Sequence, residues 1–415
     1  MAERNLTDSM GKKNGDGSHR RGSLLRKVLL CCTLVAVSSL GGVCLTGCSI
    51  VERVKYEFSG SGVDTWENAA IEEGYLTSVE EYYYNHLPEQ LQEPYREIYV
   101  RLMRGEDSGD MMSSIGVEDF WDTYYAVLAD HPEIFWLGPS AQVEESGLTN
   151  TVVSYDFEVT VPQEARASMR EQIEAAADEC ISQIPEGASD YEKIKFVYEY
   201  IIETTAYDSQ MPDTQNIQSV FLYHTSVCAG YSKAFQYVLN RMGLFCTYIT
   251  GTIKDGGEHG WNLVRIGDQY YYVDVTWGDP VFANGLKEGT GVTNYNYLCC
   301  RSQDLFQTHV PGDAIPLPEC TSDDFNYYKM NNCYYEEFDY DTIYQALMDS
   351  VWSEQDSIVM KFGTESAYLE AQYELFEADL LRDPGSYLMD LYGVDSWNYR
   401  YHTADQFWMI TIYWK

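Results

Sequence analysis

Cys228 has the sequence surroundings that suit a nucleophile. Directly after it, apolar side chains recur at helical spacing from Tyr231 to Met242, and the run closes at Gly243, a residue typical of the C-terminal end of a helix. Cys228 is therefore expected at a helix N-terminus. There the positive end of the helix dipole favours the thiolate, which is the reactive form of cysteine.

His259 is the histidine that the strand pattern brings close to a carboxylate. Strands are predicted at residues 259–266 and 269–277, joined by a two-residue turn at Gly267-Asp268. In that register His259 and Asp274 are diagonal neighbours on one face of the hairpin, with backbones about 7–8 Å apart. A cysteine nucleophile requires a base that is held by an acid, so Cys228, His259 and Asp274 are candidates for one catalytic site.

Three segments in this order resemble the transglutaminase-like superfamily, which has a papain-like Cys–His–Asp arrangement. They are residues 226–231 (SVCAGY), residues 259–262 (HGWN) and residues 272–280 (YVDVTWGDP). The resemblance covers roughly residues 189–282, and a weaker similarity extends to His309. This chain departs from the family pattern at Gly260, where the family has an alanine.

The resemblance implies an α+β fold in which the cysteine helix packs against an antiparallel sheet. It also implies roles, with Cys228 as the nucleophile, His259 as base and then acid, and Asp274 as the group that orients the imidazole. The chemistry implied is acyl transfer at an amide. The thiolate forms a thioester, which water hydrolyses or an amine converts to a cross-link. Neither a cofactor nor a metal is expected.

Other residues of the site follow less directly from the sequence. The backbone N–H of the cysteine is one candidate donor to the oxyanion, and Gln218 or Trp261 is a side-chain candidate. Tyr231, Trp261 and Gln218 are also the residues expected to line the site. His224 and His309 are interpreted as loop residues, although either could line the site instead.

The other cysteines form no metal motif. The chain contains no CxxC pair, so a structural zinc site is not predicted. One disulfide among Cys299, Cys300 and Cys320 is compatible with an exported chain, but the sequence leaves its pairing open.

The N-terminal residues have the order of an export signal. A basic flank from Arg20 to Lys27 precedes an apolar run from Val28 to Val43, and Leu45-Thr46-Gly47-Cys48 resembles the lipobox of a bacterial lipoprotein. That resemblance implies cleavage before Cys48 and lipidation of its thiol. The alternative is an uncleaved anchor, because Val28 to Gly47 is long enough to cross about 30 Å of hydrocarbon as a helix. Either interpretation attaches the protein to the cell membrane, with residue 49 onward on the extracellular side.

The chain is strongly acidic, with 27 basic against 65 acidic side chains and a net charge of −38. Such a surface repels phosphate backbones, so nucleic-acid binding is disfavoured. The acidic surface is interpreted first as a source of solubility, and a cationic protein or peptide partner is the narrower alternative.

The length indicates several structural units, since 415 residues exceed one average domain of about 150. The predicted fold class is α+β. The predicted units are a lipoprotein-type signal at 1–47, a tether at 48–62, a mainly helical N-terminal region at 63–150, a transglutaminase-like catalytic domain at 151–320 and a small α/β C-terminal domain at 321–415.

Local patterns predict elements around the site. Strands are expected at Ile134–Leu137 and Thr151–Val161, and a helix is expected to start at the capping box of Ser189 and Glu192. For the C-terminal domain the predicted elements are a strand pair around 331–332, helices at 340–351 and 366–381, and strands at 357–362, 397–402 and 406–414.

The sequence as a whole favours a cell-surface cysteine hydrolase or acyltransferase that acts on peptides, proteins or cell-wall peptides. The alternative is a non-catalytic surface module that keeps the transglutaminase-like fold for binding. A binding module has no need of all three residue types, which favours the enzyme. A solute-binding lipoprotein would show two similar lobes, and the sequence shows no such duplication.

Overall fold

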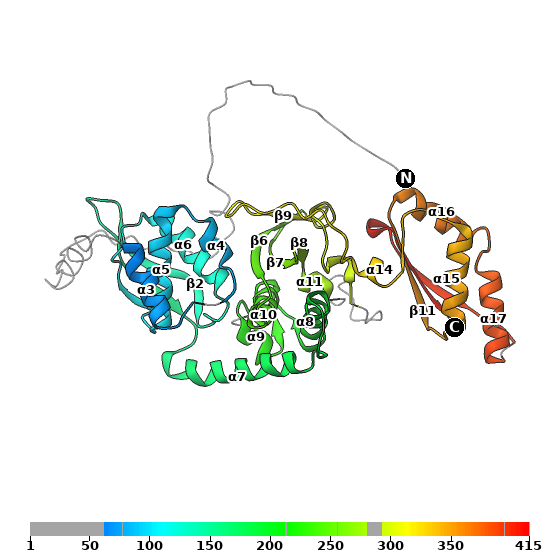
Figure 1. Cartoon of the computed structure of the whole chain (residues 1–415), viewed down its shortest axis with the longest axis horizontal. Coiled ribbons are helices and arrows are strands. Elements are labelled where there is room, and N and C mark those ends of the chain that lie inside the picture. Colours follow the sequence, from blue (N-terminus) through cyan, green and yellow to red (C-terminus); the bar gives the residue numbers. More distant parts are fainter. Residues whose placement is uncertain are drawn as a thin grey trace, which may run out of the picture.

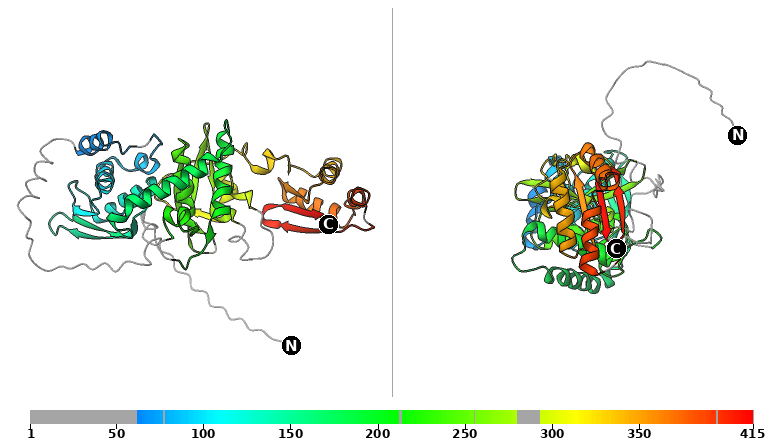
Figure 2. Two further views of the ribbon diagram at one scale, coloured as in Figure 1. Left: turned by 90° about the horizontal axis from the view of Figure 1, so that it is seen from below. Right: turned by 90° about the vertical axis from the view of Figure 1, so that its right-hand side faces the viewer.

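The computed structural model describes residues 62–76, 78–211, 214–254, 256–279, 293–393 and 395–414. The predicted signal, Cys48 and all but the last residue of the predicted tether lie outside these residues. The described parts lie in a row (Figures 1 and 2). N-terminal helices and a small sheet come first, a helix-and-sheet core follows, and a second sheet with its own helices comes last. The predicted α+β class is confirmed.

The N-terminal part is mainly helical, as predicted. Its helices are α3 (Gly62–Glu72), α4 (Tyr82–His86), α5 (Glu89–Met103) and α6 (Val117–Asp130), and its antiparallel sheet has the order β1-β3-β2, with β1 at Ser108–Asp110, β2 at Leu137–Glu145 and β3 at Val152–Val159. The predicted strand at Ile134–Leu137 is wrong. Residues 134–136 are buried in a turn, and the strand begins only at Leu137. An apolar run of four residues cannot distinguish a buried turn from a buried strand.

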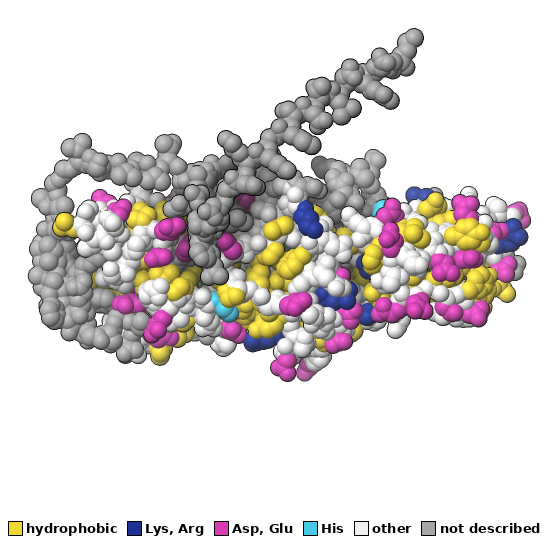
Figure 3. All heavy atoms as spheres, turned by 90° about the horizontal axis from the view of Figure 1, so that it is seen from above, with side chains coloured by type: hydrophobic (Ala, Val, Ile, Leu, Met, Phe, Trp, Pro, Cys, Tyr) yellow, Lys and Arg dark blue, Asp and Glu magenta, His cyan; other side chains and the backbone are white. Residues whose placement is uncertain are grey.

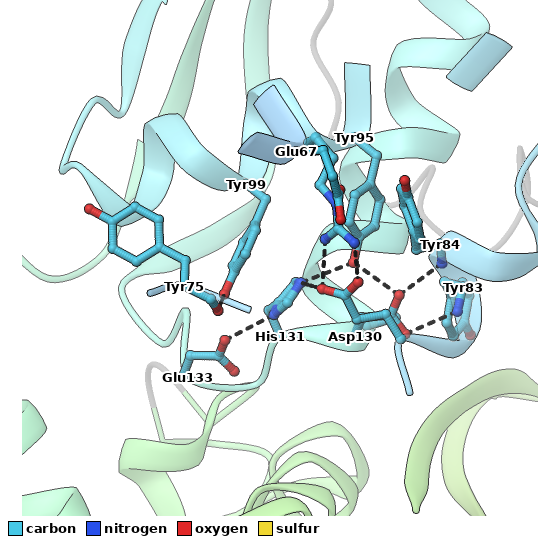
Figure 4. Close-up of polar contacts among 12 residues, drawn as sticks. Glu67, Tyr75, Tyr83, Tyr84, Tyr95, Tyr99, Asp130, His131 and Glu133 are labelled. Atoms are coloured by element: carbon cyan, nitrogen blue, oxygen red, sulfur yellow. Dashed lines mark hydrogen bonds and ion pairs between the residues drawn. The ribbon is translucent and has the colours of Figure 1, made fainter. Parts of the chain in front are cut away.

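A buried polar network holds these helices together (Figure 4). The carboxylate of Asp130, at the end of α6, accepts hydrogen bonds from the backbone N–H groups of Tyr83 (3.0 Å) and Tyr84 (2.9 Å) in α4. The Tyr95 hydroxyl in α5 donates to the same carboxylate (3.0 Å) and lies 3.0 Å from Nε2 of His131. Three helices therefore meet at one acidic side chain.

Helices surround the central sheet. They are α7 (Gln163–Ser182), α8 (Asp190–Thr204), α9 (Ile217–Phe221) and α10 (Cys228–Arg241), and a short parallel strand pair, β4 (Ala206–Tyr207) with β5 (Thr225–Ser226), precedes α10. Helix α8 starts with the predicted capping box of Ser189 and Glu192. Helix α10 is followed by Gly243 at φ +75°, a left-handed conformation that favours glycine.

The central antiparallel sheet has the order β8-β7-β6-β9 and packs against α10. Its strands are β6 (Cys246–Ile253), β7 (Glu258–Ile266), β8 (Gln269–Val273) and β9 (His309–Pro311). The predicted hairpin register is confirmed, since Ile266 pairs with Gln269 and Leu263 with Tyr272. The predicted end of the second strand is wrong. It stops at Val273, and residues 275–278 form the short helix α11 (Val275–Gly278).

The segment after the central sheet leads into a C-terminal unit. The segment holds η1 (Tyr295–Tyr297), α13 (Ser302–Leu305) and α14 (Tyr327–Met330). The sheet of the unit has the order β10-β11-β13-β12, with β10 at Tyr334–Tyr335, β11 at Ser357–Phe362, β12 at Tyr399–Ala404 and β13 at Met409–Trp414. Its helices are α15 (Tyr340–Trp352), α16 (Glu365–Phe376) and α17 (Arg382–Tyr392), and they lie beside the sheet in Figure 1.

Two predictions for this unit are wrong. Residues 331–332 do not join a strand pair, because β10 follows α14 and pairs in parallel with β11. The helix expected at 366–381 is α16, which ends earlier, at Phe376, and α17, beyond the expected end, was not predicted.

Buried apolar side chains form two separate clusters. One runs from Tyr82 to Cys320 and is shared by the N-terminal helices and the central sheet, and the other runs from Ile343 to Trp414. The predicted domain boundaries stay predictions. The described cysteines, Cys299, Cys300 and Cys320 included, are free thiols. Within the described residues no helix combines the length and the apolar character needed to span a membrane.

Candidate active site

Cys228 is the first residue of α10 and its side chain is half-buried. Val227 before it is extended, so the chain turns sharply into the helix. Gly230, two residues further on, is packed so closely that an added Cβ would overlap Ser226 Oγ and lie 2.8 Å from Ser219 Oγ. The backbone N–H of Cys228 belongs to the first helical turn, whose N–H groups have no partner within the helix. It can therefore donate to an oxyanion formed beside the thiol.

His259 lies in β7 opposite Gly251 of β6 and is almost fully buried. Its Nε2 lies 2.7 Å from Oδ2 of Asp274, which is completely buried. Since Nε2 donates to the carboxylate, Nδ1 is left for the Cys228 thiol, which forms a side-chain hydrogen bond with this imidazole. The structure thus brings together Cys228, His259 and Asp274.

Asp274 reaches the imidazole from the end of a strand rather than from within it. It is the residue before α11, and its Oδ1 accepts a hydrogen bond from the backbone N–H of Trp277 (3.0 Å). One carboxylate oxygen therefore caps the helix and the other faces His259. This cap fixes the orientation of the carboxylate.

The electrostatics of the pair favour an ion pair. Burial alone would lower the pKa of His259, but the charge and hydrogen bond of Asp274 and the hydrogen bond with Cys228 outweigh burial and raise that pKa to about 10. Burial likewise raises the pKa of Asp274. The charge and hydrogen bond of His259, followed by those of His309, outweigh it and hold the pKa well below the usual range.

His309 is the functional residue whose place the sequence did not predict. Its Nε2 lies 2.9 Å from the same Oδ2 of Asp274, and its Nδ1 lies 2.8 Å from Oγ1 of Thr308. It is buried in β9, where it pairs with Ile253 at the end of β6. The weak similarity to the family pattern near His309 was the only sequence signal that this residue belongs to the site.

Aromatic rings surround the two imidazoles. The Trp261 ring is stacked near His259, with centroids 6.0 Å apart, and stands edge-on to His309 at 5.1 Å. The Trp277 ring lies 6.0 Å from His259 and 4.8 Å from His309. Because Trp261 is fully buried, it supports the imidazoles from within the core, whereas Trp277 is half-exposed.

The other predicted lining residues lie in the interior. Tyr231 is fully buried, and its hydroxyl donates to the carbonyl of Thr205 (2.8 Å) and to Asp279 (3.1 Å). Gln218 is buried in α9, and its amide group has no hydrogen-bond partner among the described residues. His224 is exposed in the turn before β5. No contact in the described structure joins these residues to the thiol.

His259, Asp274 and His309 also have the residue types of a metal site. One ligand atom of each lies within 4.8 Å of the others, and two imidazoles with a carboxylate suit a zinc ion. The sequence predicts no metal. The two hydrogen bonds to Asp274 Oδ2 account for this arrangement from the side chains themselves.

A model of the transglutaminase-like superfamily matches residues 179–275. The kyphoscoliosis peptidase of Mus musculus is 23% identical over 156 residues, covering 34% of this chain and 24% of the mouse protein. The corresponding peptidase of Homo sapiens is 24% identical over 151 residues, covering 32% of this chain and 23% of that protein. The matched part is thus about a quarter of each relative.

Among solved structures, a crystal structure of a TGase is similar at 14% identity, covering 46% of this chain and 49% of that chain. Its TM-score is 0.25, too low to support an argument. The family match includes Cys228, His259 and Asp274. Residues 179–275 are therefore a transglutaminase-like domain.

Proposed function

We propose that this protein is a cell-surface cysteine hydrolase or acyltransferase that cleaves amides in peptides, proteins or cell-wall peptides through a thioester. The observation that carries the proposal is the chain of hydrogen bonds from Cys228 through His259 to Asp274. A buried imidazole held by a carboxylate beside a half-exposed thiol at a helix start is the arrangement that nucleophilic catalysis requires.

The proposed reaction has two stages. The Cys228 thiolate attacks the amide carbonyl, the His259 imidazolium gives its proton to the leaving amine, and the C–N bond breaks to leave a thioester. In the second stage His259 takes a proton from water, which attacks the thioester; the C–S bond breaks, a carboxylic acid is released, and the Cys228 thiolate is restored beside the protonated His259. An amine in place of water would give a new amide. The Cys228 backbone N–H supports the oxyanion in both stages.

We favour hydrolysis over cross-linking. Water is abundant outside a cell, and no group in the sequence marks a dedicated amine site. The two curated relatives are named as peptidases, which is in keeping with hydrolysis. The non-catalytic binding module remains the competing function, and it predicts peptide binding without turnover.

Mass spectrometry of peptides and cell-wall fragments tests this proposal. The full chain and its Cys228→Ala variant are incubated with the same mixture. A gain of one water in a fragment, seen only with the wild type, supports hydrolysis, and loss of ammonia with a new link between fragments supports acyl transfer. Unchanged fragments with both proteins, together with retention of peptide on both, would favour the binding module.

We propose also that Cys48 anchors the protein to the extracellular side of the cell membrane. The basic flank, apolar run and lipobox-like sequence support this location. The N-terminal peptides of the wild type and of Cys48→Ala are compared by mass spectrometry after membrane fractionation. The wild-type peptide is expected to carry the added mass of the lipid, and the Cys48→Ala peptide is expected to lack it. A wild-type peptide whose mass equals that of its unmodified sequence would contradict lipidation.

A further inference from the structure

A pocket of about 250 Å³ lies beside the imidazoles of the candidate site. Ile253 and Lys254 line it at the end of β6, and Trp277 lines it from α11. Gln307 and Thr308, directly before β9, complete the lining. Because β6 and β9 are neighbouring strands, the pocket is formed where the sheet edge meets the helix that Asp274 caps.

The pocket and the site share a wall. The Trp277 ring that lines the pocket lies 4.8 Å from His309 and 6.0 Å from His259, measured between centroids. Thr308, another lining residue, lies with Oγ1 2.8 Å from Nδ1 of His309. A group held in the pocket is thus separated from the imidazoles by a single indole ring.

The chemistry of the lining favours an anion. Lys254 is the one charged residue among the described residues of the lining, and the Gln307 amide adds a neutral hydrogen-bond donor. None of the lining residues that the structure describes is acidic, although the chain carries 65 acidic side chains. Figure 3 shows acidic side chains distributed along the described surface of one face. The Ile253 side chain and the Trp277 ring offer apolar contact to an aliphatic stem.

We propose that this pocket is a substrate subsite that binds a carboxylate carried on a short apolar stem, as in an acidic residue of a peptide. The inference rests on the proposed function, because it takes the pocket to hold part of an amide substrate of Cys228. The carboxylate pairs with Lys254 and accepts from the Gln307 amide, while the stem packs on Trp277. The carboxylate of a peptide belongs to a side chain or to a free C-terminus, and the experiment separates these sources.

Binding to the full chain carrying Cys228→Ala tests the subsite without turnover. Three short peptides are compared by calorimetry: a capped peptide with one glutamate, the same peptide with glutamine, and the glutamine peptide with a free C-terminal carboxylate. The glutamate peptide is expected to bind about five-fold more tightly than its glutamine partner, the upper range for a partly exposed ion pair. The difference should shrink as salt is added.

Substitutions at Lys254 locate the effect. Lys254→Gln should abolish the preference for glutamate and Lys254→Glu should reverse it. Arg382→Glu makes the same change of charge on the exposed α17, far along the chain, and should leave the preference intact. A preference for the free C-terminus that depends on Lys254 would also support the pocket and would identify the carboxylate as terminal.

Three results would overturn the subsite. They are equal binding of all three peptides, no binding of any peptide, and equal effects of Lys254→Glu and Arg382→Glu on the preference for glutamate. Turnover by the wild type separates the two proposals. Cleavage with no carboxylate preference overturns the subsite and leaves the proposed function standing. A Lys254-dependent preference in binding with no cleavage of any peptide overturns the proposed function and leaves the carboxylate pocket.

Discussion

At the scale of single residues, one carboxylate oxygen serves two imidazoles. Asp274 Oδ2 lies 2.7 Å from His259 Nε2 and 2.9 Å from His309 Nε2. A buried carboxylate with two such donors is held in one orientation, and so is the imidazole that contacts the thiol. His309 is therefore expected to act on the reaction through Asp274, as a positioning residue.

Substitution of His309 is expected to slow amide cleavage and to change its pH dependence. His309→Ala removes one donor from Asp274, so the rate constant kcat should fall about 10- to 100-fold. The freed carboxylate interacts more strongly with His259, so the pKa of His259 rises further. For the wild type, kcat/KM should fall as the pH passes through about 10, where His259 loses the proton that the leaving amine needs. In His309→Ala this fall should occur at higher pH.

His309→Gln is the matched control, because its amide N–H can replace Nε2–H as a donor. It should recover part of the lost rate and return the fall of kcat/KM toward the wild-type pH. A purely structural role of His309 predicts instead that both variants lose rate or stability with the pH profile unmoved.

At the scale of secondary-structure elements, Gly260 is explained by its neighbour on β6. A Cβ added at Gly260 would lie 2.5 Å from Cε2 and 2.6 Å from Oη of Tyr248. The large Tyr248 ring therefore occupies the space that the alanine of the family would need. Because His259 directly precedes Gly260, any shift here moves the His259 imidazole.

Gly260→Ala is expected to lower the free energy of unfolding by about 1–3 kcal/mol, the range for overpacking in a core. The double variant Gly260→Ala with Tyr248→Leu should recover part of this loss, since the ring that opposes the methyl group is gone. Gly147→Ala is the control, because its added Cβ would meet no atom within 4 Å. Urea unfolding of the four proteins measures the effect. Equal stability of Gly260→Ala and wild type would contradict the crowding.

Local sequence patterns were sufficient for the elements that carry the cysteine and the histidine. The turn at Gly267-Asp268 fixed the register of β7 and β8, and the capping box fixed the start of α8. The end of β8 was not predictable in this way. The Asp274 side chain caps α11, so the residues after it form a helix instead of continuing the strand. Which of these two conformations forms depends on tertiary contacts.

Helix α17 was not predicted, and its first turn contains Pro384 and Gly385, two residue types of low helix propensity. Proline in the first turn of a helix loses no internal hydrogen bond, so Pro384 is compatible with a helix that starts at Arg382. His309 was missed for another reason. Its position depends on the pairing of a three-residue strand with β6, more than 50 residues earlier, and no local pattern reports such a contact.

At the scale of the whole molecule, the N-terminal helices share a core with the transglutaminase-like domain. The hydrogen bonds that cross this junction include those from the Tyr83 hydroxyl to the Tyr248 carbonyl (2.9 Å) and from the Gln236 amide to the Ala129 carbonyl (2.9 Å). Close to it lies the buried His131, whose ring stacks on Tyr99 with centroids 3.7 Å apart (Figure 4).

His131 should make the stability of this core depend on pH. Burial lowers its pKa, but the charge and hydrogen bond of Glu133 and the contacts with Glu81 outweigh burial and raise the pKa to about 9. Because the folded pKa lies above the ordinary value of 6.5, this contribution is complete below pH 6.5 and is lost as the pH rises through 9. From the two pKa values the loss amounts to about 3 kcal/mol.

His131→Gln isolates this contribution from other titrations. Burial lowers the pKa of Lys233 and of Lys361 from 10.5 to about 8, so these groups raise the free energy of unfolding as the pH rises through that interval, which overlaps the interval of His131. The difference in free energy of unfolding between wild type and His131→Gln should therefore shrink from pH 6.5 to pH 9.5. A difference that stays constant with pH would show that His131 does not carry the charge in the folded state.

The central claim, an activated thiol at Cys228, is tested most directly by alkylation with iodoacetamide at neutral pH, followed by peptide mapping. An unassisted cysteine is only a few per cent thiolate at pH 7, so labelling of Cys228 should be about ten-fold slower, or more, in His259→Ala than in wild type. Cys333 is also half-exposed and burial raises its pKa to about 11, so it should be labelled slowly and equally in both proteins. Equal labelling of Cys228 in the two proteins would contradict the account.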